Sequence, residues 1–166
     1  MDNYIGISDN KMKHCLGVAR KCYQIAKSRN YDEIFCRKMF MLGYVHDIGY
    51  EFSTESEGHG CIAAGIVETL GISDYAFVSA IKFHGYKLDD SLPVERTKEL
   101  EILIEADLSV DHMGSEVNPS DRLLSIGFRY GAESKQYKNA KYNALVLGLV
   151  EDSKQIENKV YKETEE

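Results

Sequence analysis

The stretch Met39-Phe-Met-Leu-Gly-Tyr-Val-His-Asp-Ile-Gly49 decides the fold that the sequence predicts. It is the second half of a helix that we expect from about Asp32 to Gly49, where glycine suits a helix C-terminus. Up to Val45 its residues are apolar almost all round the helical projection, and such a helix packs at the centre of a bundle. His46 and Asp47 then follow directly, which is unusual for a core helix.

Helical periodicity continues along nearly the whole chain, and no segment alternates convincingly with period two. Each further helix that we predict has an apolar face and a residue that can cap or stop it. Five of these helices are predicted to span Asp9 to Ser28, His59 to Leu70, Asp74 to His84, Glu95 to His112, and Asn143 to Val160, and another is predicted to begin at Pro119. Their expected N-caps are Asp9, Ser73 and Asn118, and residues 50–57 are expected to form a polar loop. The predicted fold class is all-α.

Length and composition narrow the class of protein. The chain has 166 residues, 43% of them hydrophobic, which suits one domain spanning residues 1–166 with its own core. Its net charge of −7 gives no reason to expect nucleic-acid or membrane binding. No apolar run is long enough for a membrane span, and Met1 to Asn10 lacks the pattern of a secretory signal. We therefore expect a cytoplasmic protein, and the amphipathic last helix is compatible with packing on its own core or in a homodimer.

The spacing of the cysteines also favours a cytoplasmic protein. Cys15, Cys22, Cys36 and Cys61 form no C-x-x-C pair and no disulfide framework, so reduced thiols in the core of a cytosolic protein are expected.

Several histidines and aspartates occupy helix positions where a plain core has none. They lie on apolar faces, at the edges of such faces or at helix ends: His14, His46, Asp47, His59, His84 and Asp107. His112, the remaining histidine, looks solvated. Any one of these histidines alone is more often a hydrogen-bonded core residue. Together they match the ligand types of divalent zinc, manganese and iron, and helix bundles build dinuclear sites from such side chains on several helices.

The order of these residues resembles the HD-domain metal-dependent phosphohydrolases. His14-Cys-Leu-Gly-Val-Ala is similar to the first motif of that family, His46-Asp47-Ile48-Gly49 to its central motif, and Asp107 after Ala106 to its last. The motifs fall within residues 11–113, and residues 114–166 are expected to add C-terminal helices. His59 and His84 resemble the additional histidines of the small dinuclear members, such as bacterial dinucleoside polyphosphate hydrolases. The residues after Asp107 differ from the pattern of those hydrolases.

The resemblance implies a ligand set and a reaction. His14, His46, Asp47 and Asp107 would hold one divalent metal and Asp47, His59 and His84 a second, with Asp47 bridging and iron or manganese as the expected metals. Asp47 and His46 would be the catalytic residues for hydrolysis of a phosphate ester or anhydride, with a nucleotide as the expected substrate, by a metal-activated hydroxide. The candidates for substrate binding are Lys82, Lys87, Arg122 and Tyr50, although solvation or packing explains each of them as well.

Three other interpretations stay open at this stage. Six such ligands also resemble those of HD-fold dinuclear iron oxygenases. A non-catalytic HD module that senses a nucleotide would keep the fold without turnover. A helical scaffold with histidines in its core would bind no metal, and chelators would then leave its stability unchanged.

Overall fold

The computed structural model describes residues 8–53 and 58–151, and within them the predicted all-α class is confirmed. Seven α-helices follow one another: α1 (Asp9–Ser28), α2 (Glu33–Val45), α3 (His59–Thr69), α4 (Tyr75–Phe83), α5 (Lys98–Asp107), α6 (Pro119–Tyr130) and α7 (Lys135–Val146). A 3₁₀ turn, η1 (Tyr50–Phe52), follows α2, and the only β-type pairing in this part of the chain is the isolated bridge between Val110 and Glu116. Ile156, Val160 and the charged end of the predicted last helix lie outside the described residues.

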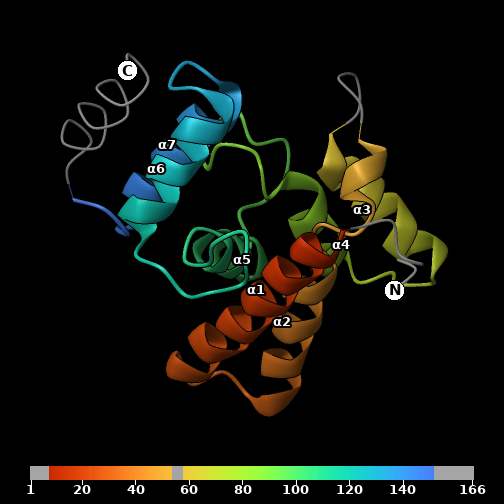
Figure 1. Cartoon of the computed structure of the whole chain (residues 1–166). Coiled ribbons are helices and arrows are strands. Elements are labelled where there is room, and N and C mark those ends of the chain that lie inside the picture. Colours follow the sequence, from red (N-terminus) through yellow and green to blue (C-terminus); the bar gives the residue numbers. More distant parts are fainter. Residues whose placement is uncertain (1–7, 54–57, 152–166) are drawn as a thin grey trace.

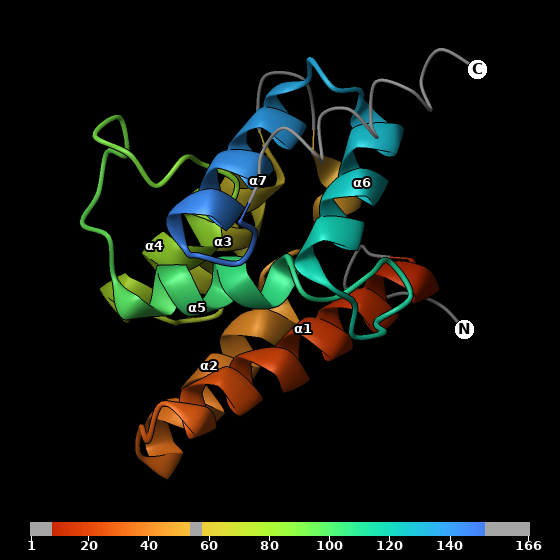
Figure 2. The same cartoon turned by 90° about the vertical axis from the view of Figure 1, so that its left-hand side faces the viewer.

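Helices α1 and α2 lie side by side and α5 packs against both, as Figures 1 and 2 show. The prediction that α2 is central is confirmed, because Met39 and Leu42 are 0% exposed. Gly43 lets the two helices approach closely, since a Cβ at this position would lie 2.8 Å from the Cα of Ala19. The apolar half of α2 that the sequence predicts therefore lies where the backbones of α1 and α2 approach most closely.

Two predicted N-caps are wrong by one residue, and one is correct. Ser8 caps α1 in place of Asp9, and Asp74 caps α4 in place of Ser73, with its carboxylate accepting a hydrogen bond from the Phe77 N–H at 2.9 Å. Ser8 and Asp74 each stand three residues before the amide from which they accept, and the neighbouring polar residue misses this register. Asn118 caps α6, with Pro119 as its first residue, as expected.

Three predicted helices are too long or are displaced. Helix α2 ends at Val45, so that residues 46–49 form a turn that Gly49 closes with φ +78°. Helix α5 spans only Lys98–Asp107, because Thr97 caps its start and the chain after Leu108 turns into the loop that pairs Val110 with Glu116. These early stops place His46, Asp47 and Asp107 at helix ends, where side chains are free to converge.

The last described helix is α7, Lys135–Val146, and not the predicted helix from Asn143. Ser134 caps its start, and Gly148 with φ +69° follows its end. Leu145, an apolar residue within the predicted helix, is 37% exposed. Among the described residues, none of the helices has both the length and the apolar character needed to cross a bilayer.

Helices α6 and α7 pack against each other and lie over one side of the bundle (Figure 2). Two buried asparagines of α7 attach it to the loop after α4: the Asn139 side-chain amide donates to the Gly85 carbonyl at 3.0 Å, and that of Asn143 donates to the Tyr86 carbonyl at 2.8 Å. The Asn143 side-chain oxygen accepts from the Leu88 N–H at 2.8 Å. These bonds fix the C-terminal helices beside His84.

The four cysteines are free, and Cys15, Cys22 and Cys36 are buried, which agrees with the expected core thiols. Burial raises the pKa of the Cys15 thiol to about 12. Cys61 is only partly buried.

Candidate metal centre

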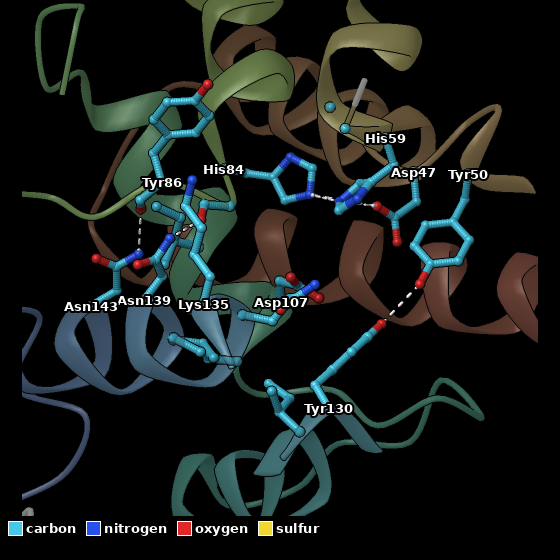
Figure 3. Close-up of a pocket in the computed structure, with 18 of the residues that line it drawn as sticks. Asp47, Tyr50, His59, His84, Tyr86, Asp107, Tyr130, Lys135, Asn139 and Asn143 are labelled. Atoms are coloured by element: carbon cyan, nitrogen blue, oxygen red, sulfur yellow. Dashed lines mark hydrogen bonds and ion pairs between the residues drawn. The ribbon is translucent and has the colours of Figure 1, made fainter. Parts of the chain in front are cut away.

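Five helices bring the six predicted ligands together, as the close-up in Figure 3 shows for His84, His59, Asp47 and Asp107. His14 lies in α1, His46 and Asp47 directly follow α2, and His59 is the first residue of α3. His84 follows the last residue of α4, and Asp107 is the last residue of α5. All but His14 thus stand at a helix terminus, where the chain turns and side chains from different helices meet.

Backbone carbonyls orient three of the imidazole rings. The Nδ1 atom of His46 lies 2.7 Å from the Gly43 carbonyl, that of His84 2.7 Å from the Ile81 carbonyl, and that of His14 2.8 Å from the Asp111 carbonyl. A carbonyl oxygen only accepts, so each Nδ1 carries the proton and donates. In the neutral ring the Nε2 atom then presents a lone pair, which is the arrangement that metal-binding histidines adopt.

The first group of converging donor atoms consists of His14, His46, Asp47 and Asp107. The Nε2 atom of His14 lies 3.0 Å from Oδ1 of Asp107. The Nε2 atom of His46 lies 3.4 Å from Oδ2 of Asp47 and 4.0 Å from Oδ1 of Asp107. Ligand atoms held about 2.1 Å from one ion lie roughly 3 to 3.5 Å apart, so the two shorter spacings suit a shared cation, while the 4.0 Å spacing is wider.

The second group consists of Asp47, His59 and His84. Oδ1 of Asp47 lies 3.4 Å from Nε2 of His59 and 3.5 Å from Nε2 of His84, and the two Nε2 atoms are 3.0 Å apart. Asp47 therefore directs one carboxylate oxygen to each group. This is the geometry that a bridging carboxylate requires.

Burial supports a cation between these donors. Nε2 of His46, Oδ1 of Asp47 and Oδ1 of Asp107 are buried, and within the described part of the chain none of them has a hydrogen-bond partner. Unpaired buried polar atoms are costly and rare in folded proteins. Lone pairs and carboxylate oxygens that face each other repel unless a positive charge lies between them. The residues therefore fit divalent cations.

The titration behaviour gives the donors the charge states that ligands need. Burial lowers the pKa of His46 to about 4, and burial together with His84 lowers the pKa of His59 to about 4. Burial would raise the pKa of Asp47, but His46, His84 and Lys11 hold it well below its usual value. His14 does the same for the pKa of Asp107 against the effect of burial. At neutral pH His46 and His59 are thus neutral imidazoles, and Asp47 and Asp107 are ionised carboxylates.

His84 differs from the other histidines. Burial would lower its pKa, but the carboxylate of Asp47, 3.5 Å from Nε2 of His84, raises it above the usual value. When no cation is bound, His84 therefore takes up a proton more readily than His46 or His59 does.

Lys11 is a site residue that sequence reasoning missed. A projection of the first helix alone places Lys11 on the solvated face with the other basic residues, but its side chain is only 16% exposed. Its ammonium lies 3.0 Å from Oδ2 of Asp47 and 3.9 Å from the ring centre of Tyr50. Its position one helical turn before His14, on the side of α1 that carries that ligand, is the signal that could have identified it.

The donor groups open into a cavity of about 590 Å³. Its lining includes Tyr50, Lys82 and Arg122 from the predicted substrate-binding set, and also His112. Lys87 is not among the lining residues; its ammonium lies 5.4 Å from the ring centre of Tyr142. The Nε–H of Arg122 donates to the Asp107 carbonyl at 3.3 Å, so this arginine lies beside a candidate ligand.

The cavity is electropositive although the chain is acidic. Its basic lining residues, apart from histidines, are Lys11, Lys82, Arg122, Arg129 and Lys135. The carboxylates among the described lining residues are Asp47 and Asp107, both candidate metal ligands. A concave site with this charge pattern attracts anions.

A family model described as HD domain matches residues 12–109, and the chain belongs to the HD-domain family. The match extends from α1 through Asp107, so it includes all six donor residues, whereas α6 and α7 lie beyond it. HD domains bind divalent metals and are commonly metal-dependent hydrolases. Comparison with curated proteins and comparison with solved structures each gave no match.

Proposed function

We propose that the protein is a metal-dependent phosphohydrolase that cleaves a phosphate ester or anhydride, with a nucleotide as substrate. The observation that carries this proposal is the position of Asp47, whose two carboxylate oxygens face two groups of imidazoles at the base of an electropositive cavity. The proposed complement is two divalent cations per chain, iron or manganese.

The first group, His14, His46, Asp47 and Asp107, would hold one cation, and Asp47, His59 and His84 would hold the other. When bound, such cations lower the pKa of a coordinated water and offset the charge that develops on phosphoryl oxygens. In this proposal Asp47 would fix the position of both cations relative to the substrate, and His46 would fix that of the first. The Nδ1–H bonds to Gly43, Ile81 and Asp111 hold the rings in place while a substrate binds.

Lys11 and Arg122 supply positive charge next to the candidate ligands. Lys11 contacts Asp47, and Arg122 lies 3.8 Å from Oδ1 of Asp107. Both cationic groups would therefore lie next to a phosphoryl oxygen that reaches the cations. The Lys11 ammonium lies over the ring of Tyr50, and the hydroxyl groups of Tyr50 and Tyr130 form a hydrogen bond of 2.8 Å. These side chains would bind and orient the phosphate group.

The test compares metal content and phosphate release in the wild type and Asp47→Ala. Protein purified without oxygen and without added metal is assayed by elemental analysis, then with p-nitrophenyl phosphate and a panel of nucleotides. We expect metal and turnover to disappear together in Asp47→Ala and to persist in Asp90→Ala, which removes an exposed carboxylate outside the cavity. Full activity in Asp47→Ala would refute the proposal, and oxygen consumption without phosphate release would favour an oxygenase.

A second variant tests the number of cations. His59→Ala/His84→Ala removes the two donors that belong only to the second group, so the metal content should fall from about two ions per chain to about one. A wild type that holds one ion even after metal is added back would reduce the proposal to a mononuclear hydrolase.

A further inference from the structure

The four histidine donors differ in how closely the protein encloses them. The side chains of His14, His46 and His84 are 3%, 0% and 4% exposed, whereas that of His59 is 33% exposed. An exposed side chain changes rotamer readily, while a buried one is held by the atoms packed round it. The second group of donors therefore depends on the contacts that keep the ring of His59 in place.

The ring of Tyr50 packs against that of His59. Their ring centres are 5.1 Å apart and their planes are inclined by 50°, an arrangement in which aromatic rings attract each other. Of the rings that contact His59 in residues 8–53 and 58–151, that of His84 belongs to another candidate ligand and that of Tyr50 does not. Tyr50 is thus the neighbour that can support this imidazole without binding a cation itself.

Tyr130 holds the outer end of Tyr50. The two hydroxyl groups are 2.8 Å apart, and Figure 3 shows the two side chains extending toward each other, Tyr50 from η1 and Tyr130 from the end of α6. Burial and this hydrogen bond raise the pKa of Tyr130 to about 12, so its hydroxyl is protonated at neutral pH. Helix α6 lies beyond the matched residues 12–109, so the HD motifs do not include this contact.

The bond between the two tyrosines is not what attaches the C-terminal helices to the bundle. Arg122 at the start of α6 donates to the Asp107 carbonyl, and the two buried asparagines of α7 donate to the loop after α4. The bond between Tyr50 and Tyr130 is exposed, and such a bond adds little to the stability of a fold because water replaces it when it breaks. Its main effect is therefore local, on the position of Tyr50.

We propose that Tyr130 is a positioning residue for the second cation: its hydroxyl fixes Tyr50, and the ring of Tyr50 fixes the imidazole of His59. These contacts run from α6 through η1 to α3 and support the most exposed of the histidine donors. The first group needs no such support, because His14 and His46 are buried and their Nδ1 atoms donate to backbone carbonyls. This inference rests on the two-cation centre of the proposed function.

The test measures the affinity of the full chain for Mn²⁺ by titration calorimetry, after a chelator has removed any bound metal. The wild type should bind two ions, and the second is identified as the one that His59→Ala/His84→Ala does not bind. In Tyr130→Phe the affinity for the second ion should fall about 3- to 10-fold, because one neutral hydrogen bond is lost, while that for the first is unchanged. Tyr50→Phe should have the same effect. The double variant Tyr50→Phe/Tyr130→Phe should be no weaker than either single variant, since all three lose the same bond.

The matched control is Tyr75→Phe, which removes the hydroxyl of an exposed tyrosine outside the cavity lining and should leave both affinities unchanged. Equal weakening of both ions in Tyr130→Phe would mean that α6 only stabilises the fold, and this would overturn the proposal. Unchanged binding, additive effects in the double variant, or a wild type that binds fewer than two ions would overturn it as well. Selective loss of the second ion without any phosphate release would support the positioning role and refute only the proposed function.

Discussion

The ammonium of Lys11 lies 3.0 Å from Oδ2 of Asp47, so the carboxylate that faces both groups of imidazoles also holds a lysine from α1. Lys11 is partly buried and contacts the ring of Tyr50. Its charge is therefore part of the site and not of the solvated surface.

Replacing this lysine should reduce turnover without removing metal. Lys11 is not a metal ligand, but its ammonium would lie next to a phosphoryl oxygen of the substrate. We expect Lys11→Met to lower kcat/KM about 10- to 100-fold while elemental analysis finds the wild-type metal content, and Lys11→Arg to restore part of the activity. Lys13→Met, an exposed neighbour on α1, is the control. Wild-type kcat/KM in Lys11→Met would show that the contact with Asp47 has no role in the reaction.

Removing the metal should destabilise the fold. Ions held only by the folded state stabilise it by about 2.7 kcal/mol at a free concentration of 100 times Kd. For a chain of this size that energy corresponds to a decrease of roughly 5 to 11 °C in Tm when a chelator is added. Thermal unfolding followed by circular dichroism would measure the change, and added metal should reverse it. Asp47→Asn should show almost no response to the chelator; an identical Tm of the wild type with and without chelator would support the scaffold interpretation.

Gly114 couples the loop after α5 to the first metal ligand. Its φ is +83°, and a Cβ there would lie 2.2 Å from the Lys13 carbonyl oxygen, while the nearby Asp111 carbonyl accepts from His14. Gly114→Ala should therefore lower the free energy of unfolding by roughly 2 to 4 kcal/mol and weaken metal binding. In Gly65→Ala, a Cβ in α3 meets nothing within 4 Å, so this control should gain about 0.5 to 1 kcal/mol. Denaturant unfolding of both variants tests the contrast, and an equal effect would contradict it.

The cap of α4 should give stability a measurable pH dependence. The carboxylate of Asp74 accepts from the Phe77 N–H and lies 2.8 Å from the Lys38 ammonium, and its hydrogen bond with Lys38 is the main cause of a lowered pKa. A carboxylate with a lowered pKa in the folded state stabilises the fold above its ordinary pKa, and this stabilisation is lost as pH falls below it. Asp74→Ala should cost about 1 kcal/mol at pH 7.

The measurement is the difference in the free energy of unfolding between the wild type and Asp74→Ala as a function of pH. It should be constant from neutral pH down to about 5 and should shrink as pH falls further. A difference that grows toward acid pH would mean that Asp74 does not act through its ionised form.

Sequence periodicity was sufficient for the fold class and for the central helix, because both follow from which residues are apolar at helical spacing. The apolar run from Met39 to Val45 predicts burial directly, and Met39 and Leu42 are indeed inaccessible. Helix ends were less predictable. Either Ser73 or Asp74 could cap α4, and the cap is the residue whose side chain reaches a free backbone N–H of the first turn. The backbone dihedral angles of single residues decide which side chain does so.

The sequence also determined the six donor types and their order, because histidines and aspartates at apolar helix positions are physically costly without a partner. Only the tertiary structure decided how they converge: Asp47 lies between two groups of imidazoles because the ends of α2, α4 and α5 and the start of α3 meet beside α1. The same holds for Lys11, which a single-helix projection assigns to solvent, and for Arg129 and Lys135, which reach the cavity through the packing of α6 and α7. Periodicity describes one helix at a time, whereas burial and charge pairing depend on the neighbours that packing supplies.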